Sequence, residues 1–159
     1  MNPAPRIAVC GASRCDPATY EQARQVGELL ARAGAIVLTG GLGGVMEAAC
    51  RGAREAGGLT VGILPGEDVR DANRYVWLPI ATGMGQARNV ILVLTASAVV
   101  AIAGEAGTLS EIALALKMGR PVVALASWRL QRSDGKEETR VHAVFSPQEA
   151  AALALRLAL

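Results

Sequence analysis

The sequence predicts an α/β protein in which a doubly wound parallel sheet is covered by helices on both faces. Short apolar segments of strand length alternate along the chain with segments whose apolar residues recur at helical spacing. The connections between them are short, and the segment 98–103 is apolar throughout, which is typical of a strand buried on both faces. Hydrophobic residues make up 52% of the chain and aromatic residues only 3%, so small aliphatic side chains must fill the core.

The expected elements follow from local signals taken in order. Asp16 is the predicted N-cap of the first helix, and Pro17 is its first residue. Gly34 is expected to end this helix, and Gly57 is expected to end the second. Residues 67–74 are polar and predict a surface loop, Ser133-Asp134-Gly135 predicts a turn, and Ser146-Pro147 predicts the start of a terminal helix. The predicted strands are 6–10, 35–39, 59–64, 75–78, 98–103 and 122–126, and the predicted helices are 17–33, 44–56, 86–94, 107–118 and 147–157.

Composition and charge bound the class of protein. The 159 residues suit a single domain over 1–159, and neither a linker nor a repeat divides it. The net charge is +2 without a basic block, and few aromatics are present, so we expect no nucleic-acid partner and no membrane association. Residues 1–6 lead into no long apolar region, so we expect no signal peptide and a cytoplasmic location.

The metal-ligand residue types are too sparse for a metal centre. Cys10, Cys15 and Cys50 lack metal-binding spacing and are expected to be free thiols. His142 is the only histidine, so neither a multi-histidine site nor a conventional Ser-His-Asp triad is expected, and we assign it a structural role. No metal site is therefore predicted.

Two glycine-rich turns indicate a phosphate site. Each of the turns 40–44 and 104–108 lies between a predicted strand and a predicted helix. The first turn of a helix has backbone N–H groups without partners at its positive dipole end, and glycine lets a phosphate approach them. Carboxyl ends of parallel strands meet at one edge, so the turns at Gly11, Gly40 and Gly104 should converge on one mouth.

Glu111 lies about one turn into the helix after the second glycine-rich turn, near the expected mouth. Its carboxylate would serve proton transfer or hydroxyl binding rather than charge neutralisation. A purely structural alternative is a capping box, with Thr108 as the N-cap and Glu111 three residues later.

These residues resemble the family known as "possible lysine decarboxylase", which includes the Lonely Guy phosphoribohydrolases and the molybdenum-cofactor carrier proteins. The family segment Pro-Gly-Gly-x-Gly-Thr-x-x-Glu corresponds here to 103–111. The resemblance also covers 11–13, 40–46 and 84–89, and it spans residues 6–126. It implies a Rossmann-like fold that binds a small phosphorylated ligand, and family members look oligomeric, so we expect a homodimer or tetramer.

The resemblance also implies site residues. In the phosphoribohydrolases an Arg and the motif Glu act on a nucleoside 5′-monophosphate, and the matching catalytic positions are Arg88 and Glu111. Decarboxylation of lysine is not supported, because that reaction usually uses a pyridoxal-phosphate lysine, and neither Lys117 nor Lys136 is placed at the mouth. The residues expected to bind ligand or phosphate are Gly11, Ser13, Gly40, Gly41, Gly43, Gly44, Met84, Arg88, Gly104, Gly107 and Thr108.

Departures from the family pattern help to choose between two functional hypotheses. Ala103 replaces the proline, Glu105 replaces a glycine in the phosphate turn, and Asn89 replaces the second residue of an Arg-Lys pair. An inward-facing carboxylate at Glu105 would repel a phosphate, so we expect it to point away. We favour a binding or carrier protein for a nucleotide-like or pterin cofactor such as molybdenum cofactor. The alternative is an enzyme that cleaves the N-glycosidic bond of a nucleoside 5′-monophosphate.

Overall fold

A seven-stranded parallel sheet forms the centre of the computed structural model, which describes residues 3–159. Every strand pair is parallel, and the order is β4-β3-β2-β1-β5-β6-β7, which confirms the predicted doubly wound α/β fold. Residues 1 and 2, which belong to the N-terminal segment considered above, lie outside the described part. The strands are β1 (Arg6–Gly11), β2 (Ile36–Thr39), β3 (Thr60–Leu64), β4 (Leu78–Ala81), β5 (Ala98–Ile102), β6 (Val122–Leu125) and β7 (Val141–Val144).

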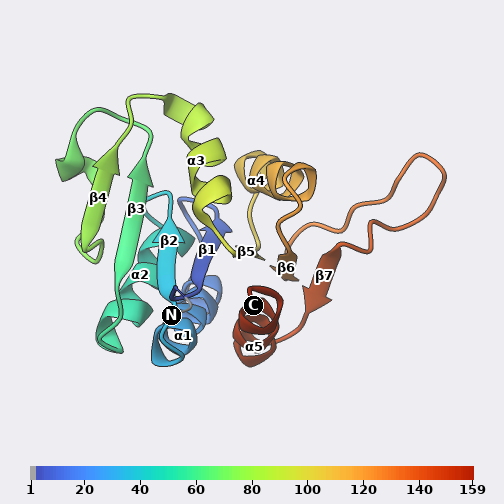
Figure 1. Cartoon of the computed structure of the whole chain (residues 1–159), viewed down its shortest axis with the longest axis horizontal. Coiled ribbons are helices and arrows are strands. Elements are labelled where there is room, and N and C mark those ends of the chain that lie inside the picture. The colour runs from blue at the N-terminus through green and yellow to red at the C-terminus, as the bar shows by residue number, and fades with distance from the viewer. Residues whose placement is uncertain (1–2) are drawn as a thin grey trace.

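Helices cover both faces of the sheet (Figure 1). On β1, Ile7 and Val9 face one apolar layer, whereas Ala8 and Cys10 face the other, because successive strand side chains point to opposite faces. The first layer contains residues of α1, α2 and α5, and the second contains residues of α3 and α4. The helices are α1 (Pro17–Arg32), α2 (Val45–Glu55), α3 (Arg88–Thr95), α4 (Ala106–Lys117) and α5 (Pro147–Leu157).

The crossover direction changes between β1 and β5, which are neighbours in the sheet. The chain leaves β1 toward α1 on one face and leaves β5 toward α4 on the other. The loops after the two strands therefore diverge and leave a crevice at the carboxyl edge, where ligands of doubly wound sheets bind.

Helix caps confirm the local sequence signals. The Asp16 carboxylate accepts a hydrogen bond of 2.7 Å from the Thr19 N–H, and Pro17 is the first residue of α1. Ser146 likewise accepts from the Glu149 N–H at the start of α5. Such a cap stabilises a helix by about 1 kcal/mol.

Glycine allows α1 and α2 to pack backbone against backbone. A Cβ added to Gly27 of α1 would lie 2.0 Å from the Ala49 carbonyl oxygen of α2, and one added to Gly52 of α2 would lie 1.8 Å from the Arg24 carbonyl oxygen of α1. Each helix thus provides the gap that the other fills. Arg24 also joins the pair by bonding Glu55 of α2 at 2.8 Å.

Two strand predictions were wrong. The predicted strand 75–78 lies instead at Leu78–Ala81, because Asn73 and Tyr75 form a turn before it. Pro79 lacks an N–H, and β4 tolerates it because this strand is at the edge of the sheet. The predicted strand 122–126 is confirmed as β6, but it was predicted to be the last core strand, and β7 follows it at Val141–Val144. That strand is short and half-exposed, so it lacks the apolar run that marks the central strands.

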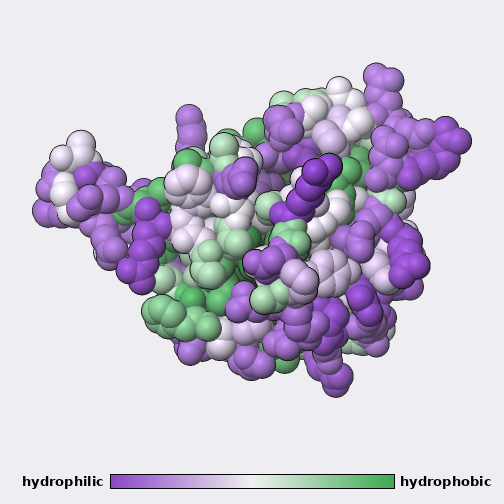
Figure 2. Space-filling model, turned by 180° about the vertical axis from the view of Figure 1, so that it is seen from behind, coloured by the Kyte–Doolittle hydropathy of each residue, from purple (hydrophilic) through white to green (hydrophobic). Residues whose placement is uncertain are grey.

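The chain between β6 and β7 projects from the body of the molecule as a long loop (Figure 1). An isolated antiparallel bridge joins Gln131 and Glu137, and the predicted turn at Ser133-Asp134-Gly135 closes it. The projection is mainly hydrophilic, while apolar surface gathers beside its base, in the region of β7 (Figure 2). Within residues 3–159, no helix is both long enough and apolar enough to cross a bilayer.

Candidate functional site

A cavity of about 250 Å³ opens where the loops after β1 and β5 diverge. The loop after β1, the first turn of α2, the start of α3 and the first turn of α4 form its walls, so segments distant in sequence meet at one mouth, as predicted. The residues lining it are Gly11, Ala12, Ser13, Leu42, Met46, Gln86, Arg88, Asn89, Glu105, Gly107, Thr108 and Glu111.

The N-terminus of α4 supplies unpaired backbone donors to this cavity. Glu105 is the N-cap but makes no side-chain cap bond, and the first N–H that bonds back is that of Leu109, to the Glu105 carbonyl at 3.0 Å. Within residues 3–159, the N–H groups of 106–108 have no protein acceptor. The capping-box alternative with Thr108 as N-cap was therefore wrong. Three free N–H groups at a positive helix end favour an anion.

Arg88 is the one buried cationic side chain among the described residues that line this cavity. Its side chain is buried at the start of α3, where its Nε donates to the Ile63 carbonyl oxygen at 2.9 Å and its Nη1 donates to Asn89 Oδ1. Burial lowers the pKa of the guanidinium, although the Glu111 carboxyl opposes that shift. These bonds hold the guanidinium in a fixed orientation and leave Nη2 without a hydrogen bond inside residues 3–159.

Gly40 makes the position of Arg88 possible. A Cβ on Gly40 would lie 2.7 Å from Arg88 Nη2 and 2.8 Å from the Met46 sulfur, which is too close for either atom. The glycine that follows β2 thus acts beneath the arginine rather than at the cavity wall. The glycine-rich turn was visible in the sequence, but the sequence did not indicate that the Arg88 guanidinium occupies the space above Gly40.

The rest of the 40–44 turn packs against the loop after β1. The Val45 N–H at the start of α2 donates to the Ala12 carbonyl at 3.1 Å, so the protein itself occupies one donor of this helix end. Gly44 has a φ of 61°, and a Cβ there would lie 2.3 Å from the same Ala12 oxygen. The turn contributes Leu42 to the cavity wall.

Glu111 lies in the cavity with an unusual protonation equilibrium. The residue is 7% exposed, and burial raises the pKa of its carboxyl from 4.5 to about 7, against the opposing effects of a hydrogen bond from the Cys10 thiol and the charge of Arg88. Burial also raises the pKa of Cys10 well above its usual value, and the nearby Glu111 adds to that shift. The carboxyl therefore exchanges its proton near neutral pH, as a general acid or base requires.

The cavity combines several predicted residues and excludes others. Gly11, Ser13, Arg88, Gly107 and Glu111 line it, together with Thr108. Met84 is 47% exposed and lies outside its lining, so contact of Met84 with a ligand stays a prediction. Other predicted residues that do not line it are Gly40, Gly41, Gly43, Gly44 and Gly104; lining residues that were not among the predicted ligand contacts are Ala12, Leu42, Met46, Gln86, Asn89 and Glu105.

Glu105 lies at the rim of the cavity and is exposed to solvent. Its backbone carbonyl accepts a hydrogen bond of 3.2 Å from the Trp128 indole N–H, which fixes the turn but leaves the side chain free of any partner in the described part of the chain. Whether its carboxylate faces a bound anion stays a prediction.

Chemistry based on metals or lysines finds no support in the cavity residues. Across residues 3–159, no group of three His, Cys, Asp or Glu side chains could hold a metal ion. Lys117 is the last residue of α4, and Lys136 belongs to the projecting loop, so neither lines the cavity. The free thiols are as expected: Cys10 and Cys50 are buried, and Cys15 is half-buried.

Comparison with known proteins gives close relatives in both structure and sequence. A molybdenum cofactor binding protein from Rippkaea orientalis is 37% identical, with a TM-score of 0.86 over 96% of each chain. The molybdenum cofactor carrier protein of Chlamydomonas reinhardtii is 34% identical, with a TM-score of 0.84 over 98% of each chain. An uncharacterized protein from Archaeoglobus fulgidus is 50% identical over 121 residues, which is 76% of this chain and 79% of that protein. The model of the SLOG cluster4 family matches residues 4–151, and the chain belongs to this family.

Proposed function

We propose that this protein binds and carries a phosphorylated pterin such as molybdenum cofactor, with the phosphate at the N-terminus of α4. The observation that carries the proposal is the meeting of the free N–H groups of Gly107 and Thr108 with the Arg88 guanidinium at one cavity. A dianionic phosphate suits a helix N-terminus with a buried cation. The pterin class is supported by the two solved relatives, which are described as binding or carrying molybdenum cofactor.

The electrostatics of the cavity favour holding a ligand over transforming it. Arg88 is the only cationic side chain of the lining, while Glu105 and Glu111 add two carboxyl groups. Asn89 stands where a second cation would strengthen stabilisation of developing charge, and its amide oxygen instead accepts from Arg88. Catalysis requires interactions that strengthen in the transition state. Binding requires only a preformed cradle, and the bonds of Arg88 Nε and Nη1 to the protein hold the guanidinium in place for one.

A substitution at the first residue of α4 tests the phosphate cradle. Proline is favoured at this helix position and removes one N–H, so Ala106→Pro should weaken binding of inorganic phosphate roughly ten-fold while the helix persists. Ala106→Gly keeps the N–H and is the matched control, so its affinity should stay close to that of the parent. Isothermal titration calorimetry measures both. Equal phosphate affinity in the two variants would show that the Ala106 N–H does not bind the phosphate and leave Gly107 and Thr108 as the donors of α4.

Native mass spectrometry of freshly purified protein tests the cargo. A co-purifying species with the mass of a phosphorylated pterin, lost on denaturation, supports the carrier. A co-purifying ligand without a phosphate contradicts it. The same spectrum gives the number of subunits.

A nucleoside 5′-monophosphate phosphoribohydrolase is the second candidate, because Arg88 and Glu111 line one cavity and Glu111 titrates near pH 7. Cleavage of the N-glycosidic bond would use Glu111 to handle water or a ribose hydroxyl. We expect slow or absent release of adenine from AMP. Rapid release that Glu111→Gln reduces ~10²–10⁴-fold, the usual effect of removing a general acid or base, would favour the enzyme instead.

A further inference from the structure

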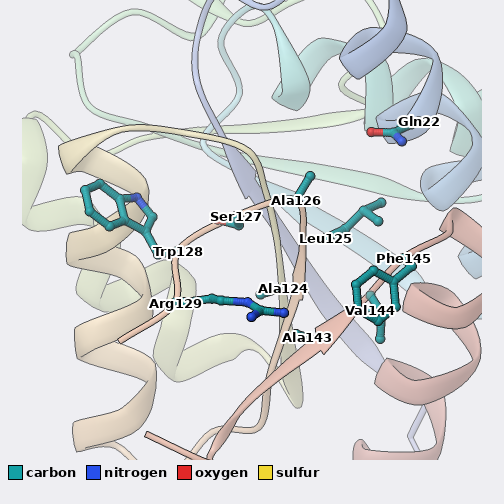
Figure 3. Close-up of a pocket in the computed structure, with 10 residues that line it drawn as sticks. All are labelled: Gln22, Ala124, Leu125, Ala126, Ser127, Trp128, Arg129, Ala143, Val144 and Phe145. Carbon is teal, nitrogen blue, oxygen red and sulfur yellow. The ribbon is translucent and has the colours of Figure 1, made fainter. Parts of the chain in front are cut away.

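A second hollow lies farther along the carboxyl edge, at the ends of β6 and β7. Its volume is about 170 Å³, and Trp128, Arg129 and Phe145 are among its lining residues. Figure 3 shows the Arg129 side chain extending across the hollow toward the Phe145 ring, while the Trp128 indole turns away toward α4. A cationic side chain facing an exposed aromatic ring is suited to a planar, electron-rich group.

The aromatic side chains gather here despite their scarcity in the chain. The sequence has only five aromatic residues, and Phe145 is its single phenylalanine. Phe145 is 79% exposed, although burying such a side chain would stabilise the fold by roughly 1.5–3 kcal/mol. Trp128 is held in place because its indole N–H donates to the Glu105 carbonyl. The exposed Phe145 ring is therefore available for contact with a ligand and is not part of the core.

The backbone between the two cavities is strained. Ala103 and Ala126 have φ values of 46° and 48°, and they are the only non-glycine residues with positive φ within residues 3–159. Both line a more open hollow of about 360 Å³, together with Gly104, Trp128 and Arg129. Each such conformation costs about 1–3 kcal/mol and is typical of ligand clamps. The Ser127 hydroxyl holds the two turns together by donating to the Ala103 carbonyl at 2.6 Å.

The open hollow and the aromatic hollow share lining residues, and the phosphate cavity begins one residue farther along the chain. Glu105 borders the phosphate cavity, Gly104 borders the open hollow, and Trp128 and Arg129 border both the open hollow and the aromatic one. The phosphate cavity, at about 250 Å³, is smaller than the ~300–1,000 Å³ typical of sites that enclose a complete small molecule. A ligand that joins a fused ring system to a phosphate at α4 would therefore extend beyond that cavity. Within residues 3–159, the Arg129 guanidinium makes no hydrogen bond or ion pair that would compete with such a ligand.

We propose that the hollow beside Phe145 binds the planar ring of the same ligand whose phosphate lies at α4, with Arg129 facing that ring. The inference rests on the proposed function and extends it to a bipartite ligand, in which a fused ring system is joined to a phosphate. The strained turns at Ala103 and Ala126 form the floor between the two parts.

Fluorescence reports on the ring position, because Trp128 lines the hollow and Trp77 is the only other tryptophan. In a Trp77→Phe protein, Trp128 is the sole reporter. The probes are inorganic phosphate, GMP and pterin-6-ylmethyl phosphate. GMP and the pterin phosphate are the ring-bearing probes. We expect whichever of these two binds more tightly to quench Trp128 emission, and inorganic phosphate to leave the emission unchanged.

Affinity variants then locate the ring independently of the spectrum. Phe145→Ala and Arg129→Ala should each weaken the ring-bearing probe by roughly five-fold or more, as expected for loss of one stacking partner, and leave phosphate affinity unchanged. Arg132→Ala, in the exposed projecting loop, is the matched control for loss of a surface cation. Circular dichroism checks that the variants are folded.

The outcomes separate the two proposals. If phosphate and both ring-bearing probes fail to bind, the proposed function fails and the ring site fails with it. If phosphate binds and neither ring-bearing probe binds more tightly, the ring site alone is overturned. Tight binding of a ring-bearing probe without any change in Trp128 emission, and with equal affinity in Phe145→Ala and Arg129→Ala, overturns it as well.

Discussion

Replacing Glu111 with glutamine should remove a specific dependence of stability on pH. The carboxyl has a folded-state pKa of about 7 against an ordinary value of 4.5, mainly because it is buried. A raised carboxyl pKa means that the folded protein holds its proton more tightly than the unfolded chain does. This contribution is therefore fully present below pH 4.5, falls as the pH rises toward 7, and is gone above it.

The magnitude follows from the size of the shift. One pKa unit is worth about 1.4 kcal/mol, so between pH 5 and pH 8.5 the parent protein should lose about 2.5 kcal/mol from this group. For a chain of this size that corresponds to roughly 5–10 °C in melting temperature. Glutamine has nearly the same shape and does not titrate, so Glu111→Gln should lack this loss.

Urea unfolding of parent and variant at half-unit pH steps from 5 to 8.5 measures the difference. Other titrating groups contribute equally to both proteins and cancel, and a constant offset from the new amide does not affect the slope. Glu105→Gln is the control, because that carboxylate lies at the rim and is exposed. A difference between parent and Glu111→Gln that stays constant across this range would show that Glu111 is ionised throughout.

Three further predictions concern binding and assembly. Sulfate, whose charge is constant over this range, should bind roughly ten-fold or more weakly at pH 8.5 than at pH 6, because an ionised Glu111 repels it, and Glu111→Gln should remove that dependence in calorimetric titrations. Gly40→Ala should displace the Arg88 guanidinium, weaken phosphate binding roughly ten-fold and lower the melting temperature, because the buried guanidinium would lose its bonds to Ile63 and Asn89; unchanged affinity would contradict the placement of Arg88 over Gly40. Light scattering at micromolar concentration should show a dimer or tetramer, because Leu94 on α3 is 51% exposed and the Ala/Leu face of α4 exceeds what one sheet face needs; a monomer would count against it.

The sequence predicted the central unit well because its signals are local. The strand 98–103 and helix 107–118 correspond to Ala98–Ile102 and Ala106–Lys117 in the structure. An apolar run of β-branched residues and a following helical period need no tertiary context. The edge strands β4 and β7 were misplaced or missed because an edge strand has one free side and half-exposed residues, so its composition resembles a loop.

The site was predictable in its outline and less so in its detail. Parallel strands place the turns after β1 and β5 at one edge, so Glu111 could be expected near the mouth, whereas Arg88, on the helix before β5, was assigned from the family resemblance. The function of Gly40 beneath Arg88 depends on a contact between residues 48 positions apart in the chain, which no local pattern encodes. The raised pKa of Glu111 similarly depends on burial by surrounding elements.

The glycine contacts between α1 and α2 have a consequence for how a ligand of the cavity would leave the protein. One wall of the phosphate cavity continues into this tightly meshed helix pair, where even a methyl group has no room, and the Ala12–Val45 bond ties its loops together. The opposite wall is the first turn of α4, attached to the neighbouring β6 loop through the Ser127–Ala103 and Trp128–Glu105 bonds. We therefore expect release of a ligand to require a hinged opening of the α4 side of the cavity, while the α1–α2 side stays in place. Hydrogen exchange of the 103–108 amides should be the earliest sign of this opening.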